Sequence, residues 1–229
     1  MMHMLAFDTA LTACSAAVVA ADPDGTCRVL ASHYEPRARG HAEVLAPIIE
    51  AVMAEAGLGF DGLDRIAVTT GPGSFTGVRI GIAMARGLRL AAGLPIVTLT
   101  TLEAIAANVA KPDGSGSAAI VAAIDARRGE VYVQAFGPGL EPRDEPRVAA
   151  VEDAAAGLPA GPVVLAGTGA RLVGAAAGHR SDLTVAAADR DLPRAAVFAA
   201  AAARRLPDAL PPLPLYLRTP DAKLPAAAG

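Results

Sequence analysis

Short apolar runs separated by turn-forming residues occupy the start of the chain, and broader helical patterns follow them. Residues 4–7, 15–21 and 27–33 have the length and composition of strands. The segment Asp22-Pro23-Asp24-Gly25 is a strong turn signal between the second and third. Three such runs predict an antiparallel meander. The elements predicted after it are helix 40–55, strand 65–70, a helix reaching residue 90, strand 95–99 and helix 101–110.

The second half repeats the opening pattern. After a Gly- and Ser-rich linker at residues 111–117, an apolar strand at 119–124 ends at Asp125, and strand 130–136 follows a polar turn. The first strand ends in the same way at Asp8, so the two aspartates lie 125 − 8 = 117 positions apart. This spacing predicts a duplicated α/β unit. The remaining predicted elements are helix 148–156, strand 162–165, a helix opening at 167–170, helix 193–206 and an extended or loosely docked proline-rich tail at 207–225.

The stretch GPGSFTGVRIG, at residues 71–81, turns a strand into the central helix. Within that helix Gly77, Gly81 and Ala85 recur at every fourth position, which leaves backbone nearly bare along one face. A Gly-rich turn before a helix can hold phosphate, but this turn is neither GxGxxG nor GxxxxGK[ST]. We therefore favour a close helix contact, and the sequence leaves open whether it forms within the chain or with a partner.

Composition narrows the class of protein. The 229 residues carry a formal charge of −3, so no basic field is available to hold nucleic acid unaided. Cys14 and Cys27 lack metal-binding spacing, which favours a reduced, cytoplasmic protein. No apolar run reaches the length of a membrane span.

Five segments occur in the order found in one known family: FDTA, GHAEVLAPII, GPGSFTGVRIG, DARRGEVY and LPLYLR. On these segments the chain resembles the TsaB (YeaZ) family of the actin-like ATPase superfamily. The resemblance implies an α/β fold of two ribonuclease-H-like lobes, each starting with an antiparallel meander on a mixed sheet flanked by helices. The expected division is 1–110 for the first lobe, 111–192 for a reduced second lobe, and 193–229 for a returning helix and tail.

The resemblance also implies a function. Family members are non-catalytic, cytoplasmic subunits that pair with TsaD and, together with the ATPase TsaE, support transfer of a threonylcarbamoyl group to the adenosine beside the tRNA anticodon. They form homodimers when TsaD is absent and reach tRNA only through the complex. The resemblance implies no cofactor and no membrane contact. The alternative is an active ATPase or phosphotransferase of the same superfamily, although such an enzyme would need glycines where Ala10 and residues 126–128 stand.

Two sets of residues are candidate sites. The catalytic relative holds a metal through His-x-x-x-His, but here Leu45 stands four positions after His41, so we expect no metal and a capping or surface role for His41. The expected partner interface comprises His41, Leu45, Ile48, Gly77, Val78, Gly81, Ile82 and Ala85. Gly81→Arg or Ile82→Asp should then abolish pairing without unfolding the chain. The expected degenerate nucleotide cleft comprises Asp8, Thr9, Asp125, Gly167 and Gly169, with the two aspartates facing each other. The sequence equally allows both aspartates to do no more than stabilise turns.

Overall fold

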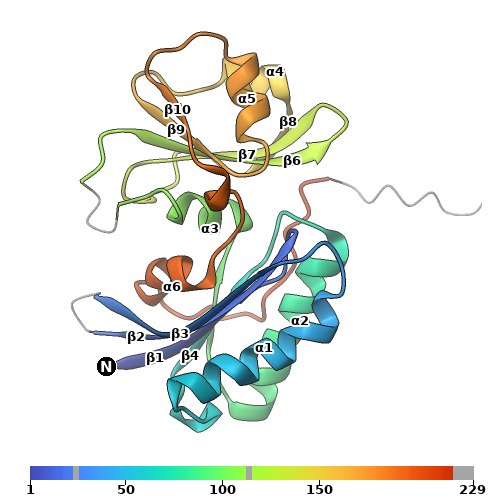
Figure 1. The fold of residues 1–229 in the computed structure, drawn as a ribbon, viewed down its shortest axis with the longest axis vertical. Coiled ribbons are helices and arrows are strands. Elements are labelled where there is room, and N and C mark those ends of the chain that lie inside the picture. The colour runs from blue at the N-terminus through green and yellow to red at the C-terminus, as the bar shows by residue number, and fades with distance from the viewer. Residues whose placement is uncertain (23–25, 112–114, 219–229) are drawn as a thin grey trace, which may run out of the picture.

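A computed structural model describes residues 1–22, 26–111 and 115–218, and it contains two mixed sheets of five strands (Figure 1). The strand order is β3-β2-β1-β4-β5 in the first sheet and β8-β7-β6-β9-β10 in the second. In each sheet the first three strands of the lobe are antiparallel, and the fourth and fifth run parallel to the first. The identical order confirms the predicted duplication.

The first lobe follows the predicted order βββαβαβ, with a short 3-10 helix added between α1 and β4. Its elements are β1 (Met2–Asp8), β2 (Ala13–Ala21), β3 (Cys27–Pro36), α1 (His41–Ala56), η1 (Phe60–Gly62), β4 (Arg65–Thr69), α2 (Phe75–Ala92) and β5 (Ile96–Leu99). Residues 23–25 of the predicted turn between β2 and β3 lie outside the described residues, as do residues 112–114 of the linker.

In the second lobe one predicted element is corrected, and a strand and a 3-10 helix are present that were not predicted. Its elements are β6 (Ala119–Arg127), β7 (Glu130–Phe136), β8 (Arg147–Ala150), α4 (Val151–Ala156), β9 (Val163–Ala166), α5 (Ala170–Ala176), β10 (Leu183–Val185) and η2 (Ala188–Arg190). The prediction of a single helix over 148–156 was wrong at its start, because residues 147–150 pair with the edge of β7. Sheet pairing here overrides the local preference of an Ala-rich segment for helix.

Alternating residues of β1 form the cores on the two faces of the first sheet. Leu5 and Phe7 pack with α1 and α2, whereas Met4 and Ala6 pack with Phe198 of α6 (Ala195–Ala203). Figure 1 shows this arrangement, with α3 (Thr101–Ala107) between the two sheets.

Helix α3 connects the cores of the two lobes. Its Ala104 and Ala107 pack with the first sheet, while Leu102, Ile105 and Ala106 pack with residues of β6 and β7. The expected division assigned this helix to the first lobe, but its side chains serve both. The relative position of the lobes therefore depends on α3.

The C-terminal segment after α6 is extended, and specific bonds dock it along the molecule. The Asp208 carboxylate accepts a hydrogen bond from the Thr98 N–H at 2.7 Å, and the Leu215 N–H donates to the Thr70 carbonyl at 2.8 Å. Arg218 then donates to the Ala126 carbonyl at 3.0 Å and pairs with Glu130 in the second lobe. This segment thus links both lobes, and residues 219–225 of the predicted tail lie outside the described residues. Among the described residues, no helix combines the length and apolar character needed to cross a membrane.

Candidate functional site

The β1–β2 turn is held by the beginnings of both helices on its face of the sheet. The Ser74 N–H donates to the Ala10 carbonyl at 2.8 Å, and His41 Nε2 lies 2.9 Å from the Leu11 carbonyl oxygen. In the other direction, the Thr9 hydroxyl donates to the Gly77 carbonyl at 2.7 Å. The Ala10 and Leu11 carbonyls and the Thr9 hydroxyl of this turn are therefore engaged within the chain itself.

The glycines of GPGSFTG are required by this contact. A Cβ atom on Gly73 would lie 2.4 Å from the Ala10 carbonyl oxygen, and one on Gly77 would lie 2.1 Å from that of Thr9. A Cβ atom on Gly81 would lie 2.9 Å from the Thr9 hydroxyl oxygen. The sequence left open whether the small residues of α2 contact the chain itself or a partner. The structure shows that Gly77 and Gly81 make the contact within the chain.

The second lobe has the same kind of close contact between glycine and backbone. A Cβ atom on Gly167 would lie 2.3 Å from the Ala123 carbonyl oxygen, and one on Gly169 would lie 3.1 Å from the Asp125 nitrogen. Gly167 and Gly71 occupy corresponding loops before α5 and α2, and both take left-handed φ angles, of 100° and 103°. Gly167 and Gly169 thus pack the loop before α5 against β6.

Asp8 is fully buried at the end of β1. Its Oδ1 accepts hydrogen bonds from the Thr69 hydroxyl and, at 3.3 Å, from the Ala10 N–H. Its Oδ2 has no hydrogen-bond partner among the described residues. Burial raises the pKa of this carboxyl to about 7, against the lowering effect of its two hydrogen bonds.

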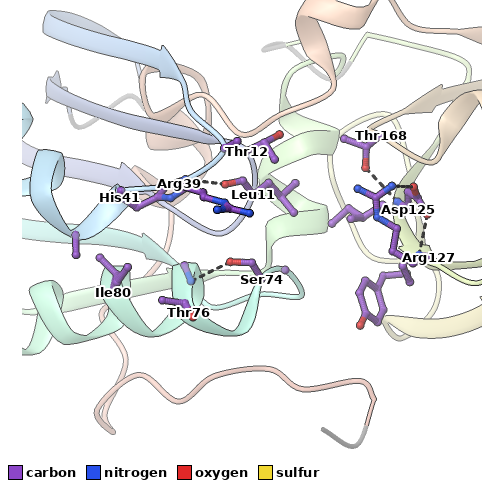
Figure 2. A pocket seen from close by; sticks show the side chains of 18 of the residues that line it. Leu11, Thr12, Arg39, His41, Ser74, Thr76, Ile80, Asp125, Arg127 and Thr168 are labelled. Atoms are coloured by element: carbon purple, nitrogen blue, oxygen red, sulfur yellow. Dashed lines mark hydrogen bonds and ion pairs between the residues drawn. The ribbon is translucent and has the colours of Figure 1, made fainter. Parts of the chain in front are cut away.

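A pocket of about 760 Å³ lies between the lobes (Figure 2). Asp125 lines it, but both carboxylate oxygens bond within their own turn, Oδ1 to the Arg127 N–H at 2.8 Å and Oδ2 to its guanidinium at 3.1 Å. The Asp125 N–H in turn donates to the Thr168 hydroxyl oxygen at 3.1 Å. Figure 2 shows these residues opposite Leu11, His41 and Ser74 of the first lobe.

The structure corrects the expected cleft. Of its five residues, Asp125 lines the pocket, whereas Asp8, Thr9, Gly167 and Gly169 do not. Asp8 cannot face Asp125 across the pocket, because it is buried behind its own turn. Within the described residues, no cluster of three His, Cys, Asp or Glu side chains could hold a metal ion. His41 is buried against Leu11 and does not have the expected surface role.

The expected partner interface also needs correction. All eight of its residues are buried within the chain: His41, Leu45, Ile48, Gly77, Val78, Gly81, Ile82 and Ala85. The expectation that Gly81→Arg or Ile82→Asp leaves the chain folded conflicts with this burial, because either change would put a charge into the packed interior.

The outward side of the two helices carries a different set of residues, none of which belongs to the expected interface. Val44, Ile80, Met84 and Leu88 are half-buried. Gly87 is exposed, and a Cβ atom there would meet nothing within 4 Å. Gly87 is therefore the glycine of α2 that the chain's own packing does not require.

Sequence reasoning missed the partners of both aspartates. Thr69 could have been found, because β4 pairs in parallel with β1 and their last residues therefore lie side by side. Thr168 gave no such signal, since its contact with Asp125 depends on how loops from distant parts of the chain pack together.

Comparisons with known proteins agree with this geometry. The family model for TsaD, described as tRNA N6-adenosine threonylcarbamoyltransferase, matches residues 30–166. The Escherichia coli tRNA threonylcarbamoyladenosine biosynthesis protein TsaB is 41% identical over 131 residues, which cover 57% of this chain and 53% of that protein. The chain spans about half the length of this relative and of the similar one from Haemophilus influenzae.

Two further matches cover nearly the whole chain. An uncharacterized protein of Mycobacterium tuberculosis is 34% identical over 220 residues, covering 96% of this chain and 93% of that protein. The solved structure of YeaZ from Pseudomonas aeruginosa superposes with a TM-score of 0.78 at 32% identity, covering 95% of this chain and all of that one.

Two lobes of identical strand order, each with a hairpin and a glycine-containing loop beside the first strand, define a protein of the two-lobed actin-like fold. Within that class the chain belongs to the TsaB (YeaZ) family, in the wider group that the TsaD family model describes.

The close contact of Gly77 with the β1–β2 turn predicts how substitutions in α2 change the free energy of unfolding. Gly77→Ala should lower the free energy of unfolding by about 1–3 kcal/mol, because the new Cβ atom overpacks against backbone. The matched variant Gly87→Ala should raise it by about 0.5–1 kcal/mol, because that helical site is open. Urea unfolding measures both, and equal effects at the two positions would contradict the packing described.

The burial of Asp8 predicts how the free energy of unfolding depends on pH. The folded-state pKa, about 7, lies above the ordinary value of 3.8, so the folded chain binds the proton more tightly than the unfolded chain. The contribution of Asp8 to stability should therefore fall as the pH rises from about 4 to about 7, and stay low above that. The difference in unfolding free energy between wild type and Asp8→Asn, followed across this window, isolates the effect. A difference that is flat or rises with pH would refute it.

Proposed function

We propose that this chain is a non-catalytic subunit that pairs with TsaD in the formation of N6-threonylcarbamoyladenosine beside the anticodon of tRNA. The names of its relatives and of the matching family model support this pathway. In this proposal TsaE joins the complex, tRNA is reached through the complex, and the chain forms a homodimer when TsaD is absent. No cofactor of its own is part of the proposal.

The observation that carries the non-catalytic role is the occupied β1–β2 turn. An actin-like ATPase needs open backbone N–H groups at this turn to hold phosphate. Here the Ala10 N–H donates to Asp8 Oδ1 at 3.3 Å, and Gly73 and Gly77 bring the start of α2 against the turn. The second turn has Arg127 and Arg128 where such enzymes carry glycines, and its Asp125 is bonded to Arg127. These features disfavour the alternative of an ATPase or phosphotransferase.

We place the pairing surface on the outward side of α1 and α2. Half-buried Val44, Ile80, Met84 and Leu88 offer apolar area, and exposed Gly87 allows another helix to approach closely. A helix-interior glycine costs about 0.5–1 kcal/mol relative to alanine. A partner helix packed at Gly87 gives a reason for that cost, because no contact within the described chain requires it.

Light scattering on a sizing column, with the chain alone and mixed with its cognate TsaD, tests the proposal. Wild type should form a heterodimer. Gly87→Arg should fold normally, because its site is open, but should weaken pairing roughly tenfold or more. The matched control Ala175→Arg, on exposed α5 of the second lobe, should pair as wild type does.

Failure of wild type to pair with TsaD would overturn the proposed function. Normal pairing by Gly87→Arg would instead overturn the placement of the surface. Circular dichroism on each variant confirms that a loss of pairing is not a loss of fold.

A further inference from the structure

The end of α2 and the C-terminal segment expose an unusual set of leucines. Leu90, Leu210 and Leu213 are 90%, 75% and 70% exposed. They border a groove of about 710 Å³ whose other lining residues are Arg86, Arg89 and Pro211. Scattered single leucines on a surface are ordinary, but leucines gathered around a groove indicate a binding surface.

Contacts within the chain fix the C-terminal segment that forms one side of the groove. Arg86 donates a hydrogen bond to the Pro212 carbonyl, and the Leu215 N–H donates to the Thr70 carbonyl. Farther along α2, Tyr216 stacks on Phe75 with ring centroids 5.6 Å apart, and its hydroxyl oxygen accepts from Arg79 Nε at 2.8 Å. The C-terminal segment is thus fixed beside α2, and a ligand would enter a surface that is already formed.

The charged side chains that line the groove are all positive. Of the described residues, Arg86 and Arg89 line it and no carboxylate does. Arg89 Nη1 is buried and has no hydrogen-bond partner among the described residues. Among the described residues, no carboxylate offsets the charge of Arg89, and a carboxylate is the acceptor that fits a guanidinium best.

We propose that this groove binds a segment of another protein that presents a carboxylate between apolar side chains, such as an acidic amphipathic helix. The carboxylate pairs with Arg89, and the apolar side chains cover Leu90, Leu210 and Leu213. This recognition combines a helix laid in an apolar groove with an arginine anchor. It goes beyond pairing with TsaD, because the residues that carry it lie on the C-terminal segment as well as on α2.

Fluorescence anisotropy with two labelled synthetic peptides tests the groove without any other subunit. Both peptides carry leucine on one helical face, and the other positions hold glutamate in the first peptide and lysine in the second. The glutamate peptide should bind the wild-type chain saturably, roughly tenfold or more tightly than the lysine peptide. Arg89→Met keeps the apolar stem and removes the charge, so it should weaken the glutamate peptide by a similar factor.

Leu213→Ser should also weaken binding, and its exposed position leaves the fold intact. Its matched control is Leu172→Ser on α5, where the leucine is 43% exposed and binding should not change. Equal binding of the two peptides, or binding insensitive to both Arg89→Met and Leu213→Ser, would overturn the proposal. So would a wild-type chain that ignores the glutamate peptide but binds phosphatidylserine vesicles, since the groove would then recognise a membrane surface.

Discussion

The packing of two helix starts on the β1–β2 turn is the contact on which the rest of the first lobe depends. The Ala10 carbonyl bonds to the start of α2, the Leu11 carbonyl lies against His41 at the start of α1, and the Thr9 hydroxyl bonds back to Gly77. Because three successive residues are held, both helices are fixed against one face of the sheet. Glycine at positions 73 and 77 makes the approach possible, since any side chain there would meet a carbonyl oxygen.

This contact bears on two possible roles of the fold, nucleotide binding at the turn and partner binding at the helices. The turn that a superfamily ATPase would present to phosphate is packed here against the starts of α1 and α2, and Asp8 behind it is buried and does not line the pocket between the lobes. The same packing turns the small-residue strip of α2 inward and leaves Ile80, Met84 and Gly87 on the outer side. We therefore propose that pairing uses the outward side of the helices and that the turn has a structural role. The second lobe repeats the arrangement with Gly167 and Gly169.

Much of the fold could be predicted from the sequence because apolar runs and turn signals are strong and the half-chain repeat is regular. The strand–Asp–turn–strand pattern at Asp8 and Asp125 predicted both hairpins. The site was harder, because a bare helix face indicates a close approach without saying which surface approaches. The strip at Gly77 and Gly81 was included in the expected partner interface, with a contact inside the chain left open, and it meets Thr9, which is 68 positions from Gly77 in sequence. Strand β8 was missed because its pairing with β7, and not its own composition, makes it a strand.

Hydrogen–deuterium exchange followed by mass spectrometry can show whether TsaD covers α1 and α2 and whether the two turns bind nucleotide. The chain would be measured alone, with magnesium ATP and with TsaD. We expect TsaD to slow exchange in peptides that cover α1 and α2. We expect magnesium ATP to leave the exchange rates of the turns at residues 8–12 and 125–129 unchanged. Protection of both turns by magnesium ATP, with no change in the helices on adding TsaD, would contradict both expectations.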